Sequence, residues 1–415
     1  MFYYFFKKTY YFFSFVLLLL LFLIQKLILI RIGYYYRNKI GHLIGNTQIY
    51  LYKKNLKKKF NLKYNSLIEI NLWVSGDKIT YPIIENFYKK KITLVPNFLL
   101  LGVYNLANKY FFFKKFSIDE HDYGMDYHNL TYKNKPEIIL NKKQIQYSEN
   151  QLKKISIFPK DKIACFINRN NFFNKKISDN TRSIKLNEFR NSDFSDFLPA
   201  AKYLAKKGYK VVRMGSHDKK FKNKYVVNYT SSKISNLLND IYLLKKADLI
   251  VTSGTGIDLV GSHFFKKPIC CVNLIPYLNI QTFKFSPKGV FLAKKLIKKK
   301  KLLSLKEIGK YDYLCLVNSR SYENAGIKIL DNSKKEILEC VKEFYQLNIN
   351  NYKYNKKEQL LQKRFYKILN NNLYKSAGYK ARLGSHKNLK LSLRQKPSAN
   401  FSLYFLKNKH WFLKD

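Results

Sequence analysis

The chain is short of acidic, turn-forming and sulfur-containing residues. Its 415 residues include only 27 Asp and Glu, 16 Gly, 9 Pro, 5 Cys and 3 Met. So little Gly and Pro excludes a collagen-like or Pro/Gly-rich disordered chain. Hydrophobic residues make up 46% of the sequence. A chain of this length can therefore bury a large core, and its length favours two domains or slightly more.

The few cysteines do not form a disulfide framework. Their number is odd, no two have CxxC spacing, and most lie in apolar runs. This pattern predicts reduced thiols that pack as small core residues in a reducing compartment. The residues concerned are Cys165, Cys270, Cys271, Cys315 and Cys340.

Several catalytic and nucleotide-binding signatures are also missing. There is no GxxxxGK[ST] phosphate loop, no GxGxxG fingerprint, no GxSxG elbow and no HExxH motif. Each of these motifs places a nucleophile, a metal or a phosphate in a defined local geometry. Their absence leaves hydrolase hypotheses without support.

The formal charge of +51 allows two interpretations. An abundance of Lys, Asn, Ile, Phe and Tyr is what coding bias toward A and T produces, and a solvated lysine surface would follow. Alternatively, the charge attracts an anionic partner such as a membrane surface. Nucleic acid is the weaker candidate, because no RNP strand, KH loop or zinc knuckle is present.

The N-terminal region is a candidate membrane anchor. Residues 10–24 (YYFFSFVLLLLLFLI) are almost continuously apolar, but at ~1.5 Å per residue they span only ~22 Å of a ~30 Å hydrocarbon core. Extending the segment brings in Lys26 on one side or Lys7 and Lys8 on the other. We expect residues 1–25 to form an anchor helix, with a helix docked on the soluble body as the alternative. The sequence contains no small-x-small cleavage site, so we do not expect a removed signal peptide.

The flanking charges predict an orientation for this anchor. Four basic residues follow the apolar run between residues 26 and 39, against two that precede it. The positive-inside rule then places the body at the cytoplasmic face of the inner membrane, in a single-pass or peripheral protein.

Strand-like and helix-like segments alternate after the apolar run. Residues 26–150 contain expected strands at 27–35, 67–75 and 92–96, each followed by a helical segment. Residues 151–345 resume the alternation, with strands expected at 162–170, 209–215, 247–254, 268–274 and 314–318. Such alternation is typical of βαβ units in parallel sheets. The sequence thus predicts an α/β fold with two Rossmann-like, doubly wound domains, an N-terminal hydrophobic helix, and a basic helical tail over 346–415.

The segment 247–273 (ADLIVTSGTGIDLVGSHFFKKPICCVN) is the most informative stretch for a binding site. A buried strand runs into a glycine loop, and we expect a short helix and a second strand to follow. Loop amides there favour an anion such as a diphosphate. A capping box, with Thr255 as N-cap and Asp258 three residues later, explains the same residues. Both can hold, since Asp258 would confine the anion to the amides of Ser253 and Gly254.

Arginines at strand ends are further candidates, because lysine dominates the basic residues of this chain. Arg213 ends the strand VVRM before Gly215, Arg169 follows CFIN, and Arg190 precedes a helix. In parallel sheets, ligands bind beyond the carboxyl ends of the strands. A fixed guanidinium there could pair with phosphate or sugar oxygens, although a surface role is the alternative for each.

Two other groups of residues are candidates for a function. His42, after Gly41 in KIGHLIGN, could act as a general base or simply start a helix. Residues 119–128 (DEHDYGMDYH) supply ligand types for a metal, but their spacing matches no standard site, and a polar loop is the better interpretation. We therefore expect no metal and no cofactor.

Five segments in order resemble a family of bacterial glycosyltransferases from surface-polysaccharide and lipopolysaccharide gene clusters. They are KIGHLIGNTQIYL, CFINRN, the run from FRNSDF to VVRMG (189–215), the run from NDIYLL to VNLIPY (239–277), and ENAGIKILDNSKKEILECVKEF (323–344). The layout is also similar to the fucosyltransferase group with the GT-B fold.

The resemblance implies a function and a set of site residues. It implies transfer of a sugar from a nucleotide-sugar donor to a glycan or lipid-linked acceptor, without a metal and near an anionic membrane. His42 and Arg213 would be catalytic, and Gly41 and Asn46 would lie on the acceptor side. The donor-binding residues would be Arg169, Arg190, Gly215, Ser253, Gly254, Thr255 and Asn273. A non-catalytic binding protein of the same fold is the alternative, and a nucleic-acid-binding surface is a third possibility.

Overall fold

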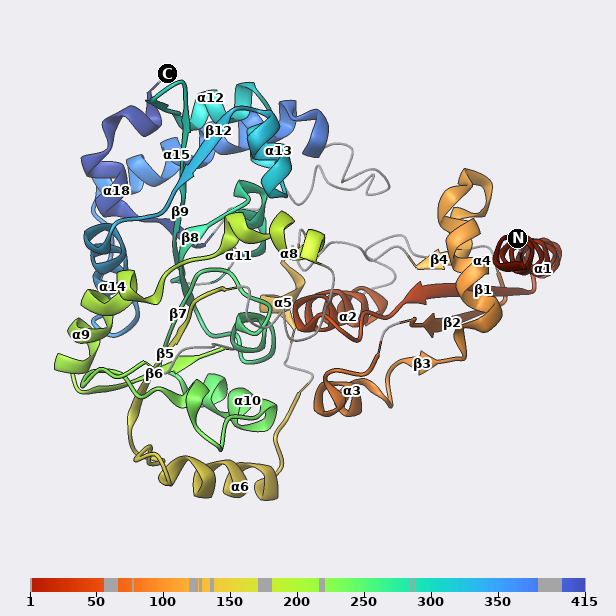
Figure 1. The fold of residues 1–415 in the computed structure, drawn as a ribbon, viewed down its shortest axis with the longest axis horizontal. Coiled ribbons are helices and arrows are strands. Elements are labelled where there is room, and N and C mark those ends of the chain that lie inside the picture. The colour runs from red at the N-terminus through yellow and green to blue at the C-terminus, as the bar shows by residue number, and fades with distance from the viewer. Residues whose placement is uncertain are drawn as a thin grey trace. The chain divides into compact units, whose positions relative to one another are not determined.

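The computed structural model describes residues 2–55, 66–76, 78–118, 126, 129–134, 138–170, 181–215, 221–283, 286, 288–379 and 398–414. The chain divides into two compact units, residues 1–124 and residues 125–415 (Figure 1). Each unit is built on its own parallel sheet. The predicted α/β fold with two parallel-sheet units and an N-terminal apolar helix is confirmed.

The first unit holds a four-stranded sheet, sheet A, in the order β3-β2-β1-β4. Its strands are β1 (Ile28–Tyr34), β2 (Ile68–Val74), β3 (Thr93–Leu94) and β4 (Ser117–Ile118), all parallel. The helices are α1 (Phe2–Ile24), α2 (Ile40–Asn55), α3 (Pro82–Tyr88) and α4 (Asn97–Lys109), and a 3-10 segment, η1 (Phe111–Phe116), follows α4. The strand order reverses between β1 and β4, because the chain first builds outward from β1 and then returns to its other side.

Helix α1 belongs to the core of this unit. Leu18 and Leu21 of α1 are buried in one cluster with Leu29 of β1 and with Val103 and Ala107 of α4, so α1 and α4 share a face of sheet A (Figure 1). Successive side chains of β2 point to opposite faces of sheet A. Trp73 there packs against Tyr50 of α2, with ring centroids 4.7 Å apart.

The second unit holds a six-stranded parallel sheet, sheet B, in the order β13-β9-β8-β7-β5-β6. Its strands are β5 (Lys162–Ile167), β6 (Tyr209–Met214), β7 (Leu249–Thr252), β8 (Ile269–Leu274), β9 (Val290–Ala293) and β13 (Asn400–Phe401). These strands are apolar runs buried on both sides, as expected for a parallel sheet covered on both faces by helices.

Two cysteines show which helices cover which face. Cys270 of β8 faces α14 (Lys334–Asn348), with its Sγ 3.7 Å from that of Cys340. Cys165 of β5 faces α10 (Leu237–Lys246), with its Sγ 3.9 Å from the Leu243 carbonyl oxygen. The strand register places these two cysteines on opposite faces. Helix α9 (Leu198–Lys206) packs with α14, and α6 (Lys142–Lys153) packs on α10. All five cysteines are free thiols, as predicted.

The tail is part of the second unit. Strand β13 pairs with β9, α15 (Lys356–Lys375) follows α14, and α18 (Leu403–Asn408) follows β13. The ring of Phe365 stacks on that of Phe401 with centroids 4.4 Å apart. Tertiary packing, which composition does not show, thus orders the described part of the Lys- and Asn-rich tail.

One local prediction was wrong. Residues 314–318 (LCLVN) form no strand, because Tyr313–Cys315 makes a 3-10 turn, η7, before the short helix α13 (Ser319–Asn324). The short helix expected after the 247–254 strand is present; it begins at residue 258 and continues as a π-helical turn, η5 (Val260–Phe264). A small antiparallel sheet was also missed; it has the order β11-β10-β12, formed by β10 (Lys295–Lys298), β11 (Lys301–Leu302) and β12 (Ile327–Leu330).

The contact between α12 (Leu305–Lys310) and α15 tests the place of the tail. A Cβ at Gly309 would lie 1.9 Å from Cγ of Asn372, whose Nδ2 donates to the Leu305 carbonyl. We expect Gly309→Ala to lower the free energy of unfolding by about 1–3 kcal/mol, because α15 must shift to make room. Urea denaturation measures this loss. Gly76→Ala is the control, since its Cβ would meet nothing closer than 3.7 Å. An unchanged midpoint for Gly309→Ala would contradict the packing.

Candidate functional site

The strand order of sheet B defines where a ligand would bind. The chain runs from β5 outward to β6 and then returns to β7 on the other side of β5, so the order reverses between β5 and β7. Ligands of open parallel sheets bind at such a reversal, beyond the carboxyl ends of the strands. Arg169 follows β5 at this edge, and Ser253 and Gly254 follow β7. These are three of the residues predicted from sequence.

Hydrogen bonds tie these two strand ends together. The Ser253 amide donates to the Ile167 carbonyl at 3.1 Å, and the Arg169 amide donates to Ser253 Oγ at 2.8 Å. The Ser192 amide donates to the Arg169 carbonyl at 3.0 Å, and Asn168 Nδ2 donates to the Ser192 carbonyl at 2.9 Å. The segment that carries Arg190 is thereby attached to the end of β5.

Arg190 lies beside Arg169 as a result. Arg190 ends the 3-10 turn η2 (Glu188–Arg190), and its Nη2 donates to the Gly254 carbonyl at 3.1 Å. The Nε atoms of both arginines are buried without a hydrogen-bond partner. We call Arg169 and Arg190 the arginine pair. Their neighbouring carboxylate is Asp258, just before η5.

The arginine pair carries more positive charge than Asp258 neutralises. Burial, and then repulsion from Arg190, lowers the pKa of Arg169 to about 9, and burial also lowers the pKa of Arg190. Burial raises the pKa of Asp258 to about 6, although hydrogen bonds from Thr255 and Thr252 oppose the shift. Near pH 7 the arginines are protonated and Asp258 is mostly ionised, so two positive charges face one negative charge. The site suits an anion.

The loop amides that the sequence assigned to the anion are used inside the protein. The Ser253 amide is bonded to Ile167, the Gly254 amide donates to Thr252 Oγ1 at 3.1 Å, and the Thr255 amide donates to Asp258 Oδ2 at 2.8 Å. The predicted amide cradle is therefore corrected: the Asp258 cap is present, but the positive charge comes from arginine side chains. Thr255 Oγ1 is buried without a partner and is a further polar group at the loop.

Arg213 has a different environment from the arginine pair. It lies in β6 with its guanidinium carbon 4.5 Å from the ring centroid of Phe194 and 5.1 Å from that of Phe221. Its side chain is buried, and Gly215 follows with a φ of +96°. The two rings are nearly perpendicular, with centroids 5.1 Å apart, and the guanidinium lies within cation–π distance of both. The role of Arg213 and Gly215 at the donor stays a prediction.

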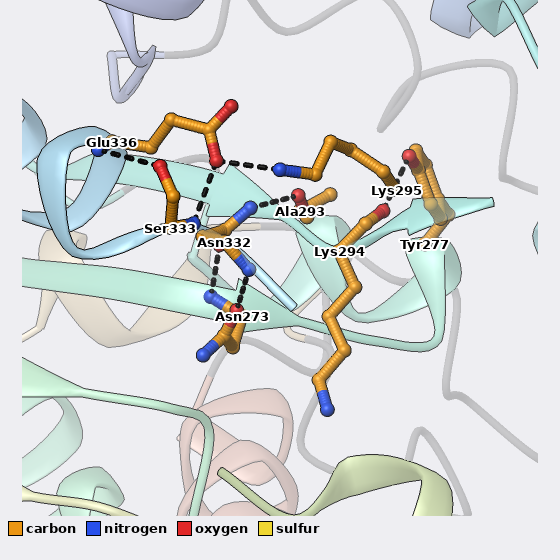
Figure 2. Close-up of polar contacts among 8 residues, drawn as sticks. All are labelled: Asn273, Tyr277, Ala293, Lys294, Lys295, Asn332, Ser333 and Glu336. Atoms are coloured by element: carbon orange, nitrogen blue, oxygen red, sulfur yellow. Dashed lines mark hydrogen bonds and ion pairs between the residues drawn. The ribbon is translucent and has the colours of Figure 1, made fainter. Parts of the chain in front are cut away.

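Asn273 at the end of β8 is part of a polar network (Figure 2). Its amide donates to Asn332 Oδ1 at 2.7 Å, and its Oδ1 accepts from the Asn332 amide at 2.6 Å. Asn332 Nδ2 also donates to the Ala293 carbonyl at 2.9 Å. Asn273 has a φ of +53°, a conformation that Asn tolerates better than most residues. Its Nδ2 is buried without a partner and is the one donor left for a ligand.

Lys294 is a residue that the sequence analysis missed. It follows β9, and its Nζ donates to the Asn191 carbonyl at 2.6 Å and contacts Asp331 Oδ1 at 2.7 Å. Lys295 points the other way, to Glu336 (Figure 2). Burial lowers the pKa of Lys294, and Asp331 opposes the shift. Lys294 thus fixes the residue next to Arg190. Its position directly after a buried strand could have identified it from sequence, but many other lysines in the chain follow apolar segments as well.

In the first unit, the predicted acceptor-side residues lie on α2. Gly41 and His42 are in its first turn, after β1 and at the reversal point of sheet A, and Asn46 follows one turn later. The rings of His42 and Tyr36 are 5.1 Å apart. Oδ1 of the buried Asn46 has no hydrogen-bond partner. The catalytic role of His42 stays a prediction.

The DEHDYGMDYH segment lies largely outside the described residues. Asp126 is described, and its carboxylate accepts from the amides of Leu130 and Thr131 at 2.7 and 2.9 Å, capping the short helix α5 (Leu130–Lys133). Within the described ranges, no group of three or more His, Cys, Asp or Glu side chains is placed to hold a metal ion.

Comparison with known structures finds distant similarities, among them two glycosyltransferases. A family 9 glycosyl transferase from Veillonella parvula DSM 2008 is 14% identical, with a TM-score of 0.33 over 59% of this chain and 81% of that one. The E. coli ADP-heptose lipopolysaccharide heptosyltransferase II is 11% identical, with a TM-score of 0.31 over 58% of this chain and 84% of that one.

Neither of these two structures is a fucosyltransferase, so they lend the predicted fucosyltransferase resemblance no support. No protein-family model and no curated protein sequence matches the chain. At this level of similarity, the site has to be understood from the chain's own residues.

The Asn273–Asn332 link offers a test of the site's framework. We expect Asn332→Ala to lower the free energy of unfolding by about 2–4 kcal/mol, because it leaves the Asn273 amide and the Ala293 carbonyl buried and unpaired. Chemical denaturation measures the change. Asn350→Ala removes an exposed hydrogen bond to Gln346 and should cost less than about 0.5 kcal/mol. Equal losses in the two variants would show that the link is unimportant.

Proposed function

We propose that the chain is a glycosyltransferase that moves a sugar from a nucleotide-sugar donor to a glycan or lipid-linked acceptor in surface-polysaccharide or lipopolysaccharide synthesis. The observation that carries the proposal is the arginine pair at the reversal point of sheet B. Two guanidinium groups near the single carboxylate of Asp258 keep a net positive charge, which suits a ligand with two or more negative charges, such as a nucleoside diphosphate. The ordered segments that resemble bacterial glycosyltransferases specify the class of reaction.

The chemistry follows from where charge develops. When the bond between the anomeric carbon and the diphosphate breaks, negative charge grows on the leaving phosphate oxygen. Fixed cations at that oxygen stabilise the transition state more than the ground state. In this proposal Arg169 and Arg190 bind the diphosphate, and Arg213 contributes more distant positive charge. Thr255 Oγ1 and Asn273 Nδ2 donate hydrogen bonds to the donor, and His42 accepts the proton of the acceptor hydroxyl.

A non-catalytic binding protein of the same fold is the second candidate. It would keep the arginine pair and bind nucleotide, but it would neither hydrolyse nor transfer the sugar. Incubation of the purified protein with ADP-, GDP-, UDP- and CDP-sugars, followed by measurement of the released nucleotide, separates the two. Slow release that His42→Ala lowers by about 10²-fold or more supports the enzyme. Binding without release in all four cases favours the second candidate.

Removing one arginine tests the diphosphate site directly. We expect Arg169→Ala and Arg190→Ala each to weaken binding of the nucleoside diphosphate by about 10- to 100-fold, because each removes a charge-assisted hydrogen bond. Calorimetric titration measures the affinity. Arg320→Ala, an exposed arginine on α13, is the matched control and should leave the affinity unchanged. A similar loss in all three variants would indicate nonspecific attraction by the basic surface.

The pH dependence of binding provides a second test. The pKa of Asp258 is about 6 in the free protein, and a bound anion would raise it further, so binding takes up a proton. Affinity for a nucleotide sugar, whose diphosphate keeps its two charges over this range, should rise as the pH falls from 7.5 to 5. The affinity should increase about tenfold for each unit by which the bound ligand raises the pKa of Asp258. In the Asp258→Asn variant, the affinity for the nucleotide sugar should not change over this pH range. A profile that keeps its slope in this variant would assign the proton elsewhere.

A further inference from the structure

The first unit presents an unusual apolar surface. Along α1, Ser14, Leu18 and Leu21 point into the protein, while the opposite side carries large exposed side chains. Residue spacing of 100° per position places these exposed residues together on the outer side of the helix. They are Phe5, Phe6, Phe12, Phe13, Val16, Leu19, Leu20, Leu23 and Ile24.

The surface continues onto η1. Phe113 of η1 packs against Phe15 and Phe22 of α1, with ring centroids 6.3 and 5.8 Å away. Next to it, Phe111 and Phe112 are 86% and 82% exposed. We call the exposed side of α1 together with Phe111 and Phe112 the phenylalanine face. Soluble proteins rarely expose so many contiguous aromatic and aliphatic side chains unless a membrane or partner covers them.

The charges around this face indicate which partner covers it. No acidic residue occurs before Glu69 or between residues 86 and 118. Lys7, Lys8 and Lys26 lie on or just after α1, and Lys109 and Lys115 lie by η1, where Lys115 Nζ is 5.0 Å from the Phe22 ring centroid. Two copies of the chain would bring these lysines together and repel. Anionic lipid headgroups would instead neutralise them while the aromatic rings enter the acyl boundary.

The packing of α1 also decides how it meets the bilayer. Its 23 residues are long enough to cross a membrane by length and composition, but Leu18 and Leu21 are in the core over sheet A. At Gly102 of α4, an added Cβ would lie 2.1 Å from Ser14 Oγ, so the two helices are in close contact. A spanning α1 would either leave this core exposed or draw the sheet into hydrocarbon, where its unpaired edge groups are costly.

We propose that the phenylalanine face binds an anionic membrane surface with α1 lying in the membrane plane and Phe111 and Phe112 inserted beside it. Both ends of α1 then stay on the side of the membrane that holds the body of the protein. The inference rests on the first unit alone, and it holds or fails independently of the arginine pair and the glycosyltransferase proposal.

Vesicle sedimentation tests the face. The purified full chain should bind vesicles of phosphatidylcholine with about one third phosphatidylglycerol more tightly than phosphatidylcholine alone, and less tightly as salt is added. The double variant Phe111→Ser/Phe112→Ser should bind about tenfold or more weakly, because two rings no longer leave water. Ile139→Ser/Leu360→Ser removes exposed apolar side chains of the second unit and should bind as the parent does. Circular dichroism and the midpoint of thermal unfolding confirm that each variant is folded.

Protease protection tests the in-plane orientation. In inverted membrane vesicles from a bacterium that expresses the chain with an N-terminal epitope, both the epitope and the body should be digested from outside. An epitope protected until detergent is added would show that α1 spans the membrane, and would overturn the proposal. So would a double Phe variant that binds vesicles as the parent does, or a parent that ignores vesicles and sediments as a dimer.

Discussion

The placement of two guanidinium groups side by side at the end of β5 is the constraint on which the proposed site depends. Among the described residues, Asp258 is the acidic neighbour of Arg169 and Arg190, and one of its carboxylate oxygens accepts hydrogen bonds from Thr252 and Thr255. Holding like charges together in a partly buried place costs free energy, which the surrounding hydrogen bonds have to offset. A bound diphosphate would offset this cost, because each guanidinium group would then have a negatively charged partner. The proposed function is the simplest use of this arrangement.

The fold supplies the rigidity that the arrangement requires. Sheet B reverses its order between β5 and β7, and hydrogen bonds between the two strand ends hold Arg169 next to Ser253. Ser192, Asn168 and Lys294 then attach the segment around Arg190 from two directions. Asn273 and Asn332 join the next strand end to the start of α14. Ser192, Asn168 and Lys294 touch no ligand in this scheme, yet they hold the segment that carries Arg190 in place.

Sequence patterns predicted the parts of this structure that depend on local chemistry. Buried strands such as KIACFI and LIVT were recognised because a parallel sheet covered on both faces requires continuous apolar runs. Arg169, Arg190 and the loop at Ser253 were found through strand ends and family resemblance, and the structure brings them together. The exposed and buried sides of α1 were not separable from sequence, since both are apolar, and only packing against α4 distinguishes them.

The errors have physical causes as well. Glycine-rich turns often leave their amides free to bind an anion, which is why the loop amides were predicted to do so. In the structure the Thr252 hydroxyl accepts from the Gly254 amide and the Asp258 carboxylate accepts from the Thr255 amide. LCLVN has the composition of a strand, yet the Asn318 side chain caps the helix that follows, and the preceding turn prevents strand pairing. Lys294 was invisible among 78 basic residues because its value lies in burial and in its partners.

The most direct measurement of the central claim is a crystal structure of the protein with a bound nucleoside diphosphate. The account predicts that the diphosphate oxygens lie within hydrogen-bond distance of both Arg169 and Arg190, with the Gly254 and Thr255 amides still bonded to Thr252 and Asp258. A diphosphate held by those loop amides, or bound elsewhere on the chain while the two arginines face solvent, would contradict it.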